Sequence, residues 1–151
     1  SIRTAASVIV TATAVIVVQD LPRMVSFFTE LGLELEGEAA VEGPWMDGCI
    51  DIDAAACDIA MLRTPDGHSR LELSCFRRPE TPGEPESRPV NTYGYLRVMF
   101  AVDDLEDTLA RLRPHGCEVL REVVNYEDVY LLCYVRGPEG LLLGLAQQLA
   151  G

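Results

Sequence analysis

Few residues in this chain are of a type that holds a metal ion or acts as a nucleophile. Only two histidines are present, His68 and His115, and all twelve basic residues are arginine. Without lysine, the chain cannot form a lysine Schiff base or supply the lysine of a phosphate-binding loop. The five cysteines are odd in number and none forms a Cys-x-x-Cys pair. We therefore expect small buried thiols in a reducing cytoplasm rather than a disulfide framework.

The overall charge argues against two classes of partner. Asp and Glu number 24 against 12 basic residues, for a formal charge of −12 at pH 7. Such a surface repels phosphate backbones and anionic lipids, so we expect no nucleic-acid and no membrane binding. The apolar run Val8–Val18 is too short to span a bilayer, and its β-branched residues favour a buried strand. The sequence thus predicts a soluble cytoplasmic protein, and the exclusive use of arginine suggests a GC-rich bacterial genome.

An internal repeat divides the chain in two. Segment 17–35 aligns with segment 101–119, so that Asp20 falls on Asp104 and a glycine falls on a glycine. In each copy an apolar strand ends at the aspartate, which can cap the helix that follows. The glycine suits a left-handed helix C-cap, after which a second strand begins.

Each copy then contains a tight turn between two strands. The turns are predicted at 64–67 and 137–140, where a proline is followed two residues later by a glycine. The strands on either side are expected at 58–63, 70–74, 129–136 and 141–145. Each copy is therefore expected to run strand, helix and three strands.

Two such βαβββ modules are expected to pack as one α+β domain, because neither is long enough to bury much surface alone. The first module is expected at 1–76 and the second at 94–151, joined by a Pro-, Glu- and Gly-rich linker at 77–93. Their strands would form a curved mixed sheet with a central cleft, and a cleft between modules is a usual ligand site.

The order and spacing of these segments resemble the vicinal oxygen chelate superfamily, which includes glyoxalases, bleomycin resistance proteins and extradiol dioxygenases. The resemblance spans about residues 13–149. Its carriers are VVQDLPRMVSFFTELGLEL, TPDGHSRLEL, VMFAVDDLEDTLARL and YVRGPEG. It implies paired βαβββ modules and, since members often dimerise, a homodimer.

Metal-dependent members of that superfamily hold a divalent ion with four side chains in the cleft. Carried over one position at a time, the resemblance places Thr13, Glu72, Arg97 and Gly144 there. Only Glu72 is an ordinary ligand, because threonine is a poor donor, glycine has no side chain and a guanidinium repels a cation. We therefore expect neither a metal ion nor another cofactor.

The leading hypothesis is a metal-independent protein that binds a small organic molecule in the inter-module cleft. The ligand-binding residues are expected to be Thr13, Trp45, Glu72, Arg97, Met99, Tyr130 and Gly144, with Met46, Met61, Tyr126 and Tyr134 nearby. Trp45, the sole tryptophan, is expected in a loop over the cleft. Arg97 would hold an anionic or phenolic group of the ligand.

Two alternatives stay open. One is a metal-free isomerase or lyase in which Glu72 is the general base and Arg97 stabilises an enolate. An ion pair between these two residues would make Glu72 a poorer base and could equally be a structural replacement for the metal. The other is a divalent-metal-dependent glyoxalase- or dioxygenase-like enzyme that uses unconventional ligands such as Asp47, Glu72 and Asp128.

Overall fold

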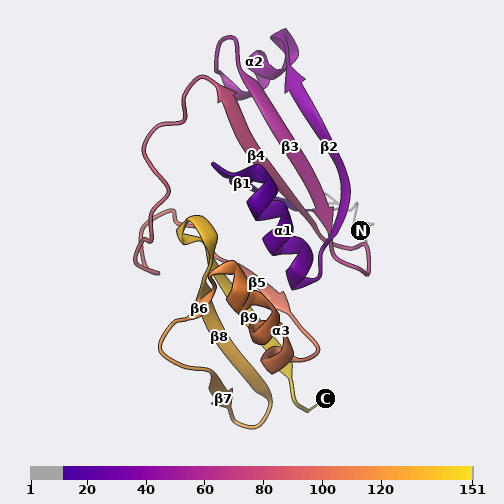
Figure 1. Ribbon diagram of the computed structural model, residues 1–151, viewed down its shortest axis with the longest axis vertical. Coiled ribbons are helices and arrows are strands. Elements are labelled where there is room, and N and C mark those ends of the chain that lie inside the picture. Colours follow the sequence, from indigo (N-terminus) through magenta and orange to yellow (C-terminus); the bar gives the residue numbers. More distant parts are fainter. Residues whose placement is uncertain (1–11, 151) are drawn as a thin grey trace, which may run out of the picture. The chain divides into compact units, whose positions relative to one another are not determined.

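The structure is a computed structural model that describes residues 12–150, so the first part of the run Val8–Val18 lies outside the described residues. Contacts divide the chain into two compact units (Figure 1). Unit 1 comprises the chain up to Leu21 and residues Gly32–Glu80. Unit 2 comprises Pro22–Leu31 and the chain from Thr81 onward.

Unit 1 is built on a four-stranded mixed sheet in the order β1-β4-β3-β2. Its strands are β1 (Thr13–Val17), β2 (Glu34–Glu42), β3 (Ala56–Arg63) and β4 (Arg70–Arg78). β1 runs parallel to β4, and the other neighbours are antiparallel.

The alternation of buried and partly exposed residues along β4 shows which face of this sheet belongs to the core. Leu71 and Leu73 are fully buried, and so are their cross-strand partners on β3, Leu62 and Ala60. Because successive side chains of a strand point to opposite faces, the intervening residue Glu72 lies on the other face. We call this second face of the unit 1 sheet the Glu72 face; it carries Thr13, Val15, Val17, Ile59, Met61, Arg70, Glu72, Ser74 and Phe76.

The expectation that Trp45 lies in a loop is wrong, because Pro44–Ile50 forms a short helix, α2. Pro44 occupies the first turn, where its missing N–H costs no hydrogen bond. The Asp47 carboxylate accepts hydrogen bonds from the backbone N–H groups of Ala54 and Ala55, at 2.9 and 3.0 Å. These contacts tie the helix to the chain that enters β3.

Unit 2 is built on a second mixed sheet in the order β5-β9-β8-β6, with β7 paired to β8. Its strands are β5 (Val98–Ala101), β6 (Glu118–Val119), β7 (Val124–Tyr126), β8 (Tyr130–Arg136) and β9 (Leu142–Gln148). Its helices are α1 (Leu21–Leu31), whose first residue Leu21 is assigned to unit 1, and α3 (Leu105–Leu112). Short 3₁₀ turns follow at Arg113–His115 and Pro138–Gly140.

Aromatic packing and capping hold the helices of unit 2. Phe28 of α1 is fully buried, and its ring centroid lies 6.3 Å from that of Phe100 on β5. Arg111 of α3 donates to the last turn of α1 at the Glu30 carbonyl. The predicted cap of α3 is confirmed, since the Asp104 carboxylate accepts from the backbone N–H of Asp107 at 3.0 Å.

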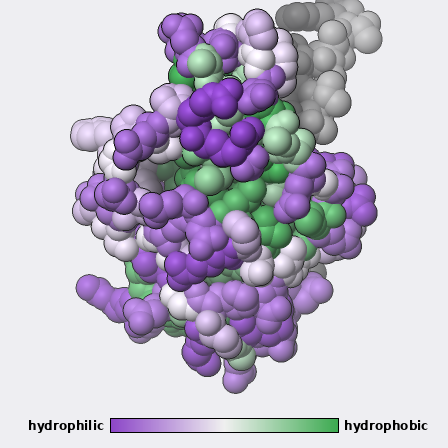
Figure 2. Space-filling model, turned by 45° about the horizontal axis from the view of Figure 1, so that its top comes forward, coloured by the Kyte–Doolittle hydropathy of each residue, from purple (hydrophilic) through white to green (hydrophobic). Residues whose placement is uncertain are grey.

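The predicted order of strand, helix and three strands is confirmed for both copies, with two additions. The first copy contains α2, and the second strand of the second copy is split into β6 and β7. The module boundaries at 76 and 94 stay a prediction. No helix among the described residues is long and apolar enough to cross a membrane. Figure 2 shows hydrophobic surface exposed between hydrophilic regions on the face that it draws.

Part of the predicted linker at 77–93 is held in place by hydrogen bonds. The Arg136 guanidinium of β8 donates to the Arg88 carbonyl at 2.9 Å and to the Gly140 carbonyl at 3.2 Å. The Tyr95 hydroxyl donates to the same Gly140 carbonyl at 3.2 Å. The connection is therefore fixed to the turn between β8 and β9 within unit 2.

Candidate ligand-binding site

Glu72 lies at the middle of its sheet face. It pairs with Val15 on β1 and with Met61 on β3, so these three side chains form one row across the sheet. One carboxylate oxygen of Glu72, Oε2, accepts a hydrogen bond from the Ser74 hydroxyl at 2.9 Å. Ser74 is only 5% exposed, so this contact is shielded from water. Within the described residues of unit 1, no arginine is ion-paired with Glu72.

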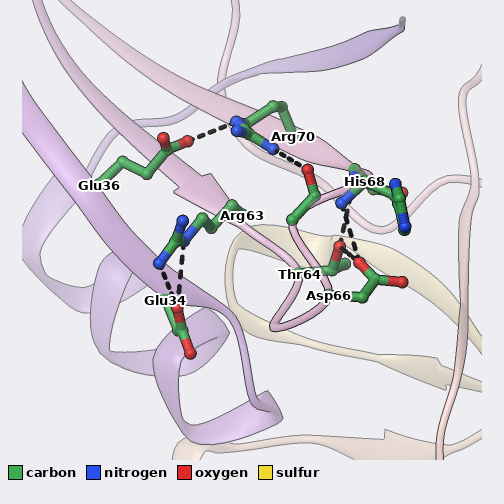
Figure 3. Close-up of polar contacts among 9 residues, drawn as sticks. Glu34, Glu36, Arg63, Thr64, Asp66, His68 and Arg70 are labelled. Atoms are coloured by element: carbon green, nitrogen blue, oxygen red, sulfur yellow. Dashed lines mark hydrogen bonds and ion pairs between the residues drawn. The ribbon is translucent and has the colours of Figure 1, made fainter.

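Ion pairs occupy the end of the Glu72 face nearest the β3–β4 turn. Arg70 pairs with Glu36 at 2.5 Å, and Arg63 pairs with Glu34 at 3.0 Å (Figure 3). Thr13 is exposed and sits opposite Arg70 in the register. The two guanidinium groups already have carboxylate partners, which lowers the net charge at this end.

Hydrogen bonds stabilise the turn itself (Figure 3). The Asp66 carboxylate accepts from the Thr64 hydroxyl at 2.6 Å and from the backbone N–H of His68 at 2.9 Å. The Thr64 hydroxyl, more than the His68 backbone, holds the pKa of Asp66 below its ordinary value. The His68 side chain is exposed in the turn.

The other end of the Glu72 face is apolar and is covered by α2. Met46 of α2 is 7% exposed and forms a cluster with Ala55 and Cys57, against which Ile59 and Phe76 pack. Burial raises the pKa of the Cys57 thiol, which makes it a packing residue rather than a nucleophile. The Glu72 face therefore changes from ion-paired at one end to apolar at the other.

Gly144 is the counterpart of Glu72 in unit 2. It pairs with Met99 on β5 and Tyr134 on β8, as Glu72 pairs with Val15 and Met61 in unit 1. A Cβ atom at Gly144 would lie 2.9 Å from the Met99 Cε and 3.1 Å from the Tyr134 Cε1. A side chain at this position would therefore require the end of the Met99 side chain and the Tyr134 ring to move.

Arg97 and the tyrosines gather on this same face of unit 2. The Arg97 guanidinium lies over the Tyr134 ring, with 5.1 Å between its Cζ and the ring centroid. Because alternate residues share a face, Tyr130 lies on the same side of β8 as Tyr134, and it pairs with Tyr126 on β7. We call the set Met99, Gly144, Tyr130, Tyr134 and Tyr126, together with Arg97, the Gly144 face.

These residues do not fit a divalent metal ion. At the four positions implied by the resemblance, Thr13 is a weak donor, the Arg97 guanidinium is a cation over the Tyr134 ring, and Gly144 has no side-chain donor. Asp47 is engaged by its own loop. Across residues 12–150, no group of three or more His, Cys, Asp or Glu side chains is placed to hold a metal ion.

The structure places the expected site residues in two groups, one in each unit. Thr13 and Glu72 share one face in unit 1, and Arg97, Met99, Tyr130 and Gly144 share one face in unit 2. Trp45 is 65% exposed on α2. The inter-module cleft stays a prediction.

Sequence reasoning missed Arg70 and Ser74 as members of the Glu72 face. The signal was available, because three polar residues at positions 70, 72 and 74 alternate with apolar residues 71 and 73. That period of two places the polar side chains together on one side of a strand.

Residues 10–145 match the family model described as Glyoxalase/Bleomycin resistance protein/Dioxygenase superfamily. The chain belongs to this superfamily. A solved glyoxalase family protein from Bacillus cereus is 46% identical, with a TM-score of 0.91 over 99% of this chain and 100% of that chain. Among proteins of curated function, none matches this chain.

More distant superfamily structures share the fold. A glyoxalase/bleomycin resistance protein from Streptomyces sp. CB03234 is 19% identical, with a TM-score of 0.59 over 91% of this chain and all of that chain. A genomically encoded fosfomycin resistance protein from Listeria monocytogenes is 12% identical, with a TM-score of 0.62 over 95% of each chain.

Proposed function

We propose that this superfamily member binds a small organic molecule, without a metal ion, and that Glu72 on the Glu72 face is its main polar anchor. The observation that carries the proposal is the state of Glu72. It is a half-buried carboxylate on an otherwise largely apolar stretch, fixed by a buried serine and not paired with an arginine of its own unit.

Such a carboxylate is a ready acceptor for a ligand. The Ser74 hydroxyl occupies Oε2, which leaves Oε1 to accept from a hydroxyl, amide or ammonium group of the ligand. Beside it, Val15 and Val17 are each 51% exposed, so apolar surface is available next to the polar anchor. A few polar groups within apolar surroundings are typical of small-molecule sites.

Arg97 supplies the complementary anchor. The Arg97 guanidinium lies over the Tyr134 ring and its side chain is exposed, so its N–H donors are accessible to a ligand. Those donors suit an anionic or phenolic oxygen of the ligand, with the exposed Met99 and Tyr130 as apolar contacts.

A metal-free isomerase or lyase is the second candidate. Glu72 has a hydroxyl partner on Oε2 rather than an arginine among the described residues of its unit, which leaves Oε1 to take a proton. It would take the proton next to a carbonyl group, and Arg97 would stabilise the enolate oxygen that forms.

The test is a fragment screen by ¹⁵N NMR with aromatic acids, phenols and amines, using wild type, Glu72→Gln and Glu38→Gln. Glu38 is a matched control: it is exposed on the opposite face of the same sheet and its substitution removes the same charge. We expect fragments that shift β1 and β4 signals to weaken about tenfold or more in Glu72→Gln. They should keep their affinity in Glu38→Gln.

Fragments that bind equally well to both variants would contradict the assignment of Glu72. Turnover of a carbonyl compound that is lost in Glu72→Gln, with binding retained, would favour the isomerase or lyase. From the family resemblance we also propose that the protein is a homodimer and that it is located in a bacterial cytoplasm. Light scattering on the purified protein would test the dimer.

A further inference from the structure

The apolar stretch of the Glu72 face has a defined residue at each end. Glu72 marks one end, and Phe76, four residues further along β4, lies in the cluster beneath α2. Four strand residues span about 13 Å. Between these limits lies one row of the sheet, in which Ser74 pairs with Val17 on β1 and Ile59 on β3.

This middle row offers apolar surface that the described residues of unit 1 leave partly uncovered. Val17 is 51% exposed and Ile59 is partly buried, whereas Ser74 is buried and turned toward Glu72. Val15, in the Glu72 row, extends the same exposed surface. An apolar group that starts at Glu72 and follows β4 would therefore run past Val17 and Ile59 toward Phe76 and the Met46 cluster.

The far boundary is held in a fixed position. The Met46 side chain inserts from α2 into the cluster with Cys57, Ile59 and Phe76. The helix that carries it is anchored by the two hydrogen bonds from Ala54 and Ala55 to the Asp47 carboxylate. A ligand chain that reaches this point meets a packed methionine, and further length gains no apolar contact on the sheet.

We propose that α2, through Met46, limits the length of the apolar part of a ligand whose hydrogen-bond donor is held by Glu72. The ligand class is a molecule with a donor head group and an apolar body of restricted length. The inference rests on the proposed function, because it takes Glu72 as the anchor of the head group.

The test uses n-alkylammonium ions from butyl to decyl, titrated into protein labelled with ¹⁵N and with ¹³C at the methionine methyl groups. An ammonium group donates to a carboxylate, and each added methylene on an apolar surface tightens binding about fourfold. We expect this gain to stop within the series. The Met46 methyl signal should shift only for the probes at which the gain has stopped.

Two methionine variants distinguish the residue that limits ligand length, Met46, from a residue beside the Glu72 anchor, Met61. Met46→Ala should let affinity continue to rise for longer probes, by about tenfold or more at the longest. Met61→Ala, which removes a neighbour of Glu72 itself, should weaken all probes by a similar factor and leave the stopping length unchanged. If Met46→Ala does not fold, Met46→Leu keeps the volume and should move the stopping length by no more than about one methylene.

The possible failures are distinguishable. Affinity that rises steadily to decyl, without a shift of the Met46 methyl signal, would overturn the role of α2 while leaving Glu72 as the anchor. Probes that bind Glu72→Gln and Glu38→Gln equally would instead overturn the proposed function, since the head group would not be held by Glu72.

Discussion

The two units repeat one strand pattern but differ at the position where metal-dependent members of the superfamily carry a ligand. In unit 1 this position is Glu72, with Ser74 two residues later donating to its carboxylate. In unit 2 the equivalent position is Gly144, with Ala146 two residues later, and the side chains of Met99 and Tyr134 fill the space. One copy has thus kept a polar anchor, and the other has become an apolar and aromatic surface with a cation at its edge.

This difference shows how a duplicated scaffold can change its chemistry. A chelate site needs donors from both copies, and loss of the donor in one copy leaves too few ligands for a divalent ion. On the proposed function, the remaining carboxylate serves an organic ligand, while the counterpart position lies against Met99 and Tyr134.

Placing a glutamate at Gly144, as at the equivalent position 72, should have the largest effect on the free energy of unfolding. Gly144→Glu forces a charged side chain into space held by Met99 and Tyr134, and should cost about 2–3 kcal/mol of unfolding free energy in urea. Gly37→Glu on β2 is the control, because no atom lies within 4 Å of its added Cβ. Equal stability of the two variants would show that the Gly144 position is not filled.

Cys117, one of two buried thiols of unit 2, should make stability fall at high pH. Burial raises the pKa of Cys117 to about 11, above the value of 9.0 for an unburied thiol. The neutral thiol is therefore favoured in the folded state, so its contribution is full below pH 9 and is lost as the pH rises toward 11. The loss should approach about 2 kcal/mol by urea unfolding across this range.

Two alanine variants isolate that contribution. Cys117→Ala should reduce the pH dependence without abolishing it, because burial also raises the pKa values of Cys57 and Cys133. Cys49→Ala, which removes the exposed thiol of α2 in unit 1, should leave it unchanged. A pH dependence in Cys117→Ala as steep as in wild type would assign the effect to other groups.

Removing the support of Glu72 should have a moderate effect. Ser74→Ala makes unit 1 resemble unit 2 at this position and should cost about 1–2 kcal/mol, because a buried hydroxyl that donates to a carboxylate is lost. The reverse change, Ala146→Ser, has no carboxylate to meet at Gly144 and should change the unfolding free energy by less than about 0.5 kcal/mol. Similar costs for the two changes would mean that the Ser74–Glu72 contact is not specific.

The smallest effect is expected at Arg97. Its guanidinium stacks on Tyr134 at an exposed site, so Arg97→Ala should cost about 0.5–1 kcal/mol of unfolding free energy. Arg113→Ala, at another exposed arginine of unit 2, is the matched control and should be neutral. A neutral Arg97→Ala would show that the stacking contributes no stability.

Local patterns in the sequence predicted most of the fold. The alternation around Glu72 and the Pro-x-Gly turns place β3, β4, β8 and β9, because both signals act over a few residues. The cap at Asp104 was predicted for the same reason. The resemblance located Glu72, and the register shows that Gly144 is its true counterpart.

The features that the sequence did not predict depend on contacts between distant segments. α2 contains a glycine and begins after another, and it is held by burial of Met46 and by the loop hydrogen bonds to Asp47. The stacking of Arg97 on Tyr134 requires the registers of β5, β9 and β8 to be known together. A shift of one residue in either pairing would turn Tyr134 to the other face.

The central claim is that Glu72 serves an organic ligand and not a divalent ion. Its most direct test is the metal content, by mass spectrometry, of protein purified without a chelator or an affinity tag. The account predicts far less than one divalent ion per chain, with no difference between wild type and Glu72→Gln. One divalent ion per chain that is lost in Glu72→Gln would contradict it and restore the chelate-type enzyme as the leading function.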